Sequence, residues 1–469
     1  MALRPQHSVI PSSAPAPARS ALPDGAVARL VAEVKGEVFR PGDPGYAAEL
    51  DGFNLIGRHR PALVVGAVTA EDVAAAVRFG AGLGLAVGVH ATGHGIAAPD
   101  EDAVLVTTRR MNAVAVDPVA RIARVEAGAR WHQVVATAAY HGLAPLNGSS
   151  PLVGVVGYTL GGGLGPLGRL YGYAADHVTR VHLVTADGRH RTVTAASDAE
   201  LFWALRGGKG NFGIVTALEF GLVPVTRLYG GGLSFPGAEA AAVLDAWRTW
   251  TAGLPETLTS SVALLRPPAL HHVPDHPAGE LAVHVRIAFT GTWEDGEELL
   301  RPLRAAGTLL ADTVADMPYS AVAEIHQDPT EPLPYHERNV VLREFDEGAL
   351  AALLAAAGPG SGCTDPMVEL RHLGGALSRP PAVPNAVGRD GAFTLSTLSL
   401  PGSPDVVLDR LAAWSTGRRY LNFLAGPDTS RSAAECFDPE TLARLLRAKR
   451  RHDPENVFRL GHALLPEPA

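Results

Sequence analysis

Two glycine-rich stretches constrain the fold of this chain more than any other feature. The first is VHATGHG at residues 89–95, which follows the apolar run LGLAVG. The second is GSSPLVGVVGYTLGGGLGPLGRLYG at residues 148–172. Each glycine costs roughly 0.5–1 kcal/mol of stability inside an ordered element, so this density requires a reason. Two reasons are open: turn formation alone, or close approach of the backbone to an anionic ligand held by amide N–H groups.

Strand and helix patterns alternate from about residue 57 to residue 225, which predicts an α+β domain. PALVVGAV, LAVGV, AVLVTT and GIVTALEFGLV have the composition of strands. EDVAAAVRFGAGLG, WHQVVATAAYHG and ELFWALRGG have the composition of helices. Thr69 with the acidic residues after it predicts a capping box, and Ser197 begins a similar cap before the third helix.

A second domain is expected after residue 225, where longer alternating strands begin. In LAVHVRIAFTG, four apolar residues fall on one face while His284 and Arg286 fall on the other. Amphipathic helices lie between such strands, which predicts an antiparallel sheet covered on one side by helices. We expect a mobile leader at 1–25, a first domain at 26–225, a second domain at 226–415, and a segment at 416–469 that returns to the first domain.

Composition excludes several classes of protein. The 469 residues carry a net charge of −8 without a basic stripe, so neither nucleic acid nor an anionic membrane surface is an expected partner. Apolar runs are too short for a membrane span. Two distant cysteines, Cys363 and Cys436, fit a reducing cytoplasm. His271, His272 and His276 lie in a proline-containing loop without further ligands, so no metal site is expected.

One literal dinucleotide motif, G-x-G-x-x-G, occurs at residues 163–168, with Asp187 downstream. Its context argues against a nicotinamide-binding Rossmann unit, because no clean apolar strand precedes it and Pro166 interrupts the helix that should follow. An NAD-dependent dehydrogenase therefore stays as the weaker alternative.

Four motifs in order carry a family resemblance: VHATGHG, then residues 148–178, then LFWALRGGKGNFGIVT, then YLNF with HDPENVFR. Together they make the chain resemble the flavoprotein superfamily of vanillyl-alcohol oxidase and p-cresol methylhydroxylase, most closely its berberine-bridge-enzyme-like and 6-hydroxynicotine-oxidase-like branch. The resemblance implies a two-subdomain FAD-binding domain of the p-cresol methylhydroxylase type, followed by a substrate domain. It spans nearly all of residues 57–459.

The resemblance implies that His94 bonds covalently to the flavin. The family's usual R-G-G-G-H loop reads His90-Ala91-Thr92-Gly93-His94 here, followed by Gly95, so an arginine and two glycines are replaced while the last histidine remains. A neutral imidazole is a competent nucleophile toward the flavin 8α position. His90 is expected to be a structural loop residue.

The second motif implies a single covalent link. Relatives with two links have a cysteine where this chain has Ser150, and a serine hydroxyl cannot form that thioether. Val153 matches a position whose small valine admits O2 in oxidases. Further matches line the flavin (Gly154, Gly157, Gly161, Gly165) or lie near the adenosine end (Gly210, Asn211, Gly213, Val215).

Substrate chemistry is expected beside the family's Y-x-N motif, here Tyr420 and Asn422, where Phe423 replaces a tyrosine that some relatives use as a base. In MVELRHLGG, period two places Glu369 and Arg371 on one face and His372 on the other. Either Glu369 or His372 could be the general base, depending on which face looks at the flavin, or Glu369–Arg371 could be a structural ion pair.

These patterns predict a cytoplasmic FAD-dependent oxidase, monomeric or homodimeric, with FAD on His94. It is expected to oxidise an alcohol, amine or benzylic centre of a small organic molecule, by analogy in secondary-metabolite tailoring or oxidative cyclisation, and to reduce O2 to H2O2. The alternatives are a flavin dehydrogenase with another acceptor, a flavin-binding protein without redox turnover, and the nicotinamide enzyme.

Overall fold

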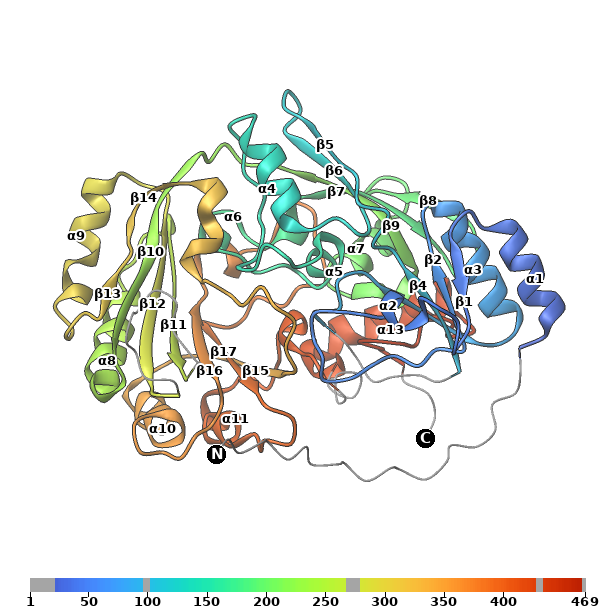
Figure 1. Ribbon diagram of the computed structural model, residues 1–469. Helices are drawn as coiled ribbons and strands as arrows, with labels where there is room; N and C mark the ends of the chain where they lie inside the picture. The colour runs from blue at the N-terminus through green and yellow to red at the C-terminus, as the bar shows by residue number, and fades with distance from the viewer. Residues whose placement is uncertain (1–21, 96–101, 267–278, 427–432, 466–469) are drawn as a thin grey trace, which may run out of the picture.

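The computed structural model describes residues 22–95, 102–266, 279–426 and 433–465. Three sheets organise this part of the chain (Figure 1). The first two lie within residues 26–225, and the strands of the third lie within residues 226–415. The sequence predicts an α+β fold with an antiparallel sheet after residue 225, and this prediction is confirmed.

The first sheet has four strands in the order β1-β2-β4-β3, with β2, β4 and β3 parallel. Its strands are β1 (Glu37–Phe39), β2 (Leu63–Gly66), β3 (Ala86–His90) and β4 (Ala103–Thr107). Helix α3 (Ala70–Gly82) packs on it and begins with the expected capping box, since Thr69 accepts from the Asp72 N–H. Helix α1 (Asp24–Glu33) begins within the last residues of the expected leader.

The second sheet is antiparallel with the order β5-β6-β9-β7-β8. Its strands are β5 (Val114–Asp117), β6 (Ile122–Glu126), β7 (Val178–Val184), β8 (His190–Val193) and β9 (Ile214–Gly221). The helices between these strands are α4 (Trp131–Ala139), α5 (Val155–Leu160), α6 (Gly168–Tyr171) and α7 (Ala199–Leu205). The cap of α7 is Asp198 and not Ser197, because the Asp198 carboxylate accepts from the Leu201 N–H.

The third sheet is antiparallel with the order β13-β10-β12-β11-β16-β17-β15, and β14 pairs with β10. Its strands are β10 (Arg227–Pro236), β11 (Leu258–Leu265), β12 (Ala282–Phe289), β13 (Ala311–Asp312), β14 (Ala315–Pro318), β15 (His336–Leu342), β16 (Met367–His372) and β17 (Phe393–Ser399). One face packs against α8 (Ala240–Thr251), α9 (Trp293–Arg304), α10 (Glu347–Ala357) and α11 (Val406–Arg410) (Figure 1).

The two faces of this sheet differ in chemistry. Val283, Val285, Ile287 and Phe289 of β12 lie in the core beneath the helices, as their alternation predicts. The opposite face contacts the turns η4 (Tyr319–Ile325) and η7 (Leu421–Phe423) and helix α6. This inner face therefore looks toward the first two sheets.

The C-terminal helix α13 (Pro439–His452) packs against α7 of the first region. Lys449 and Asp453 near its end are fully buried, and their side chains pair at 2.6 Å. The Lys449 ammonium also donates to the carbonyls of Asn211 and Phe458, both at 2.9 Å. A buried lysine thus ties the returning tail to the motif around Asn211. None of the helices in the described ranges has the length and apolar composition to cross a membrane.

Replacing Asp453 by alanine leaves the Lys449 ammonium buried without its counter-charge. We expect Asp453→Ala to lower the free energy of unfolding by about 3–5 kcal/mol. Chemical denaturation followed by circular dichroism measures this loss. The control is Glu298→Ala in the exposed Arg301–Glu298 pair, which should cost less than about 1 kcal/mol. Equal effects of the two substitutions would contradict the role given to the buried pair.

Candidate active site

In the loop that follows β3, the carbonyl oxygens of residues 92–94 accept hydrogen bonds, whereas the N–H groups of residues 91–94 have no partner among the described residues. None of the N–H groups of residues 91–94 donates to a described residue. Three carbonyl oxygens accept, those of Thr92 from Phe53 N, of Gly93 from Asn54 N, and of His94 from the Tyr335 hydroxyl. Consecutive backbone N–H groups that have no partner within the protein are suited to bind an anion.

Glycine is required at position 93 of this loop. Its φ is +70°, and a Cβ would lie 2.6 Å from the Cα of Gly52. His90, at the end of β3, is buried, with Nε2 3.3 Å from the Asp51 carbonyl oxygen. The structural role of His90 stays a prediction.

His94 is a neutral imidazole with one nitrogen oriented and the other free. Its ring stacks on Phe53 at 4.2 Å between centroids, and Nδ1 lies 2.9 Å from the Thr92 hydroxyl. Nε2 is buried and has no hydrogen-bond partner among the described residues. Burial, with a smaller contribution from the charge of Arg130, lowers the pKa of His94 to about 3. The ring therefore keeps a lone pair available at neutral pH.

Positive charge gathers beside the same loop. A pocket next to Ala91 is lined by Arg109, Arg130, His132 and neighbouring residues. The start of α5 closes on the loop from another side, since a Cβ at Gly154 would lie 3.3 Å from the Thr92 side chain. Ser150 is buried, and Val153 is half-buried directly before Gly154.

The remaining glycines of the family match divide into two kinds. At Gly161, Gly165 and Gly213 a Cβ would collide with protein atoms, namely Asn422 Oδ1 at 2.0 Å, Asn147 O at 2.0 Å and Val184 O at 2.6 Å. At Gly157 and Gly210 a Cβ would meet nothing within 4 Å. Packing therefore explains the first three glycines without a ligand. Val215 is buried, and Asn211 donates to the carbonyls of Gly208 and His462.

The literal G-x-G-x-x-G at 163–168 lies between α5 and α6, so a helix and not a strand precedes it. Asp187 pairs with Arg191 at 3.0 Å and accepts from Thr185. This geometry does not form a Rossmann βαβ unit.

The structure decides which face of β16 looks inward. Val368 and Leu370 lie in the helix-covered core, so Glu369 and Arg371 point toward the first two sheets. His372 lies on the other face, stacks on Phe393 at 5.3 Å, and has Nε2 3.2 Å from Arg169. Burial lowers the pKa of His372 to about 3. Of the two alternatives, the Glu369 face is the one directed at the flavin-binding region.

Glu369 is held in a closed network on this inner face. Its carboxylate accepts from Arg286 at 2.5 Å, from Arg371 at 2.8 Å and from the Ser261 hydroxyl at 2.9 Å. Burial alone would raise the pKa of Glu369, but the charges of Arg371 and Arg286 outweigh it and hold the pKa well below its usual range. A carboxylate bound in this way is a weak proton acceptor.

Asn339 of β15 fixes the Y-x-N turn, a role that the sequence analysis missed. Its amide donates to the carbonyls of Tyr420 and Phe423 at 2.9 and 2.8 Å and accepts from the Tyr420 N–H at 2.6 Å. Asn422 in turn donates to the Tyr158 carbonyl at 2.7 Å. Burial, reinforced by Tyr158, raises the pKa of Tyr420 well above its usual value. No sequence pattern indicated this role, because the register that sets Asn339 opposite Ser396 is seen only in the structure.

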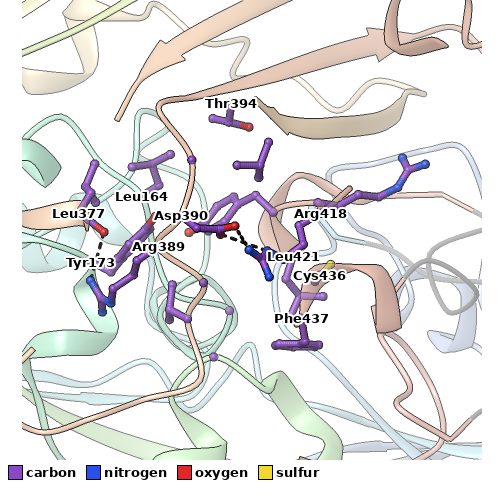
Figure 2. Close-up of a pocket in the computed structure, with 18 of the residues that line it drawn as sticks. Leu164, Tyr173, Leu377, Arg389, Asp390, Thr394, Arg418, Leu421, Cys436 and Phe437 are labelled. Carbon is purple, nitrogen blue, oxygen red and sulfur yellow. Dashed lines mark hydrogen bonds and ion pairs between the residues drawn. The ribbon is translucent and has the colours of Figure 1, made fainter. Parts of the chain in front are cut away.

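A pocket is lined by Tyr420, Gly161 and Leu164, together with Thr394 of β17. Charged side chains surround it, and Figure 2 shows the contact between Asp390 and Arg418 across its middle. A pocket lined by aromatic and apolar side chains together with a few charged ones is typical of small-molecule binding sites.

No group of three or more metal-ligating side chains occurs in the described ranges, and His271, His272 and His276 lie outside them.

Comparison with known proteins places these features in context. A family model described as an FAD binding domain matches residues 61–194. The (R)-6-hydroxynicotine oxidase of Paenarthrobacter nicotinovorans is 30% identical, with 92% of this chain and 97% of the relative covered. The crystal structure of 6-hydroxy-D-nicotine oxidase from Arthrobacter nicotinovorans superposes with a TM-score of 0.77 at 26% identity, covering 92% of this chain and 98% of that one.

A xylooligosaccharide oxidase of Myceliophthora thermophila, solved with xylobiose, has the same fold, with a TM-score of 0.80 at 21% identity over 95% of this chain and 100% of that one.

Gly157 within α5 and Gly161 at its C-terminal end allow a test of whether a glycine is needed for packing or for contact with a ligand. Gly161→Ala should displace Asn422 and cost about 1–3 kcal/mol, because its Cβ overlaps the amide oxygen. Gly157→Ala in the same helix should be neutral or stabilising by up to about 1 kcal/mol. Thermal unfolding of both variants checks this ranking. Loss of bound flavin in Gly157→Ala alone would show that a ligand occupies the space beside Gly157.

Proposed function

We propose that this chain, which belongs to the vanillyl-alcohol oxidase and p-cresol methylhydroxylase superfamily in its berberine-bridge-enzyme-like and 6-hydroxynicotine-oxidase-like branch, is an oxidase that carries FAD on His94. It is an FAD-dependent oxidoreductase by its relatives. The observation that carries the proposal is the free, buried Nε2 of a neutral His94 at the tip of a loop with unpaired amides.

The residues around the loop fit FAD. Backbone N–H groups of residues 91–94 and the cations Arg109 and Arg130 suit the diphosphate. The orphaned Nε2 of His94 suits attachment at the flavin 8α carbon. We propose Gly154, which lies against Thr92, and the exposed Gly157 for the flavin. We propose Gly210, Asn211, Gly213 and Val215 for the adenosine end. When bound, the flavin accepts the hydride that leaves the substrate carbon.

The protein's own residues would bind and orient the substrate between the loop and the inner face of the third sheet. We propose that Arg371 and Tyr420 position it, with the pocket lined in part by Tyr420 as its entrance. Glu369, locked between two arginines, keeps Arg371 in place. The hydroxynicotine and xylooligosaccharide oxidases among the relatives support an amine or alcohol as the oxidised group.

Oxygen is the proposed electron acceptor, and H2O2 the product. Val153 supports it as a small side chain directly before Gly154, which contacts Thr92 of the His94 loop. We further propose that the enzyme works in the cytoplasm as a monomer or homodimer with one covalent link, since Ser150 cannot form a second.

Acid precipitation tests the link to His94. Yellow colour and flavin fluorescence should stay with the precipitated wild-type protein and move to the supernatant for His94→Ala. His90→Ala is the matched control and should keep the colour with the protein, because its ring is bonded to the Asp51 carbonyl. Release from wild type would make the role of His94 wrong, and a colourless protein would overturn FAD binding itself.

Oxygen use is tested by reducing the flavin without air and then admitting air. (R)-6-hydroxynicotine, xylobiose and benzyl alcohol form the first panel of reductants, with photoreduction as the substrate-independent route. The reduced wild-type enzyme should reoxidise rapidly and release H2O2. Val153→Ile should slow reoxidation at least tenfold, about 1.4 kcal/mol of barrier, by filling the access space. Reoxidation only by an added dye would instead favour the dehydrogenase.

A further inference from the structure

Strand β15 connects the three parts of the proposed site through alternate residues. Tyr335, directly before the strand, donates its hydroxyl hydrogen bond to the His94 carbonyl at 2.9 Å. Asn339 holds the Y-x-N turn through three hydrogen bonds. Glu337 lies between them, two residues from each, so it is about 7 Å along the strand from both.

The side chain of Glu337 points to the inner face. Asn339 pairs with Ser396, which pairs with Glu369, and directly opposed residues of antiparallel strands share a face. Glu337 is two residues from Asn339 and so lies on the face of Glu369 and Arg371. Its backbone is bonded in both directions to Ala425, just beyond the Y-x-N turn.

The Glu337 carboxylate forms no hydrogen bond or ion pair with another described residue. Its half-buried side chain contrasts with Glu369 on the same face, which is closed in by two arginines and Ser261. A carboxyl group on the inner face without a partner among the described side chains can accept a hydrogen bond or a proton from a ligand that binds there.

We propose that Glu337 is a catalytic residue that accepts the proton of the substrate's hydroxyl or amine group during oxidation. As the C–H bond breaks, its electron pair leaves as hydride to FAD. The O–H or N–H bond transfers its proton to the carboxylate, and the carbon becomes a carbonyl or imine. The inference rests on the proposed function and adds the proton acceptor to it.

The charges around Glu337 set the pH at which it can work. Burial raises the pKa of Glu337 to about 8, against the lowering charge of Arg371, with Glu369 and Asp328 raising it and Lys209 lowering it. Lys209 comes from the short helix η2 (Lys209–Phe212) of the flavin-binding region, and burial lowers its pKa to about 8. A base must be ionised, so its activity should rise with pH through about 8.

The test uses holoenzyme with flavin content confirmed. The visible spectrum of the oxidised flavin is recorded from pH 6 to 10 for wild type, Glu337→Gln, Glu337→Asp and the control Glu347→Gln, which changes an exposed carboxylate of α10. Wild type and Glu347→Gln should show a spectral step near pH 8. Glu337→Gln should lose it, and Glu337→Asp should keep a step at a shifted pH.

The second measurement is the rate of flavin reduction in stopped flow, with the panel compound that bleaches wild type fastest. The rate should rise through about pH 8 in wild type and fall about 100-fold or more, without a pH step, in Glu337→Gln. A spectral step retained in Glu337→Gln, or its absence in wild type, would overturn the proposal, as would an unchanged pH profile of reduction. Loss of flavin from wild type would instead count against the proposed function.

Discussion

Burial of charge on the inner face of the third sheet is the constraint on which the candidate site depends. Glu369 and Arg286 are nearly inaccessible and Arg371 is largely buried, so the carboxylate and the two guanidinium groups must neutralise one another. This closed triplet fixes Arg371 beside the Phe423 ring, at 4.9 Å. Glu337 lies on the same face two strands away, in β15, and its carboxylate has no such arginine partners among the described residues. Two acids on one face thus have opposite pKa shifts because their neighbours differ.

The glycine-containing loop at residues 91–95 is suited to bind an anion. Three of its carbonyls accept hydrogen bonds from Phe53, Asn54 and Tyr335, while its N–H groups donate to no described residue. The same contacts hold His94 against Phe53, in surroundings dry enough to keep the imidazole neutral. The same hydrogen bonds therefore fix both the backbone N–H groups that could bind an anion and the His94 imidazole that could act as a nucleophile.

Much of this arrangement was predictable from the sequence, because it follows from local rules. The capping box at Thr69, the alternation of β12 and the return of the tail depend on neighbours in sequence or on simple amphipathicity. The inward face of β16 was left open, because period two separates Glu369 from His372 without saying which side is covered. Asn339 and Glu337 were missed because HERNVVL lacks clean alternation, and their importance comes from partners more than 80 residues away.

The spacing within β15 has a consequence for how this enzyme can change. Three alternate residues of this segment point to the inner face of the sheet. Tyr335 contacts the His94 loop, Asn339 holds the Y-x-N turn, and Glu337 lies between them at the proposed substrate site. Substitution can alter any one of them alone. Insertion or deletion of a single residue would turn the downstream side chains toward the helices and break the alignment of the three contacts. The length of β15 is therefore fixed by the spacing of its three contacts, whereas the identity of each residue can change independently.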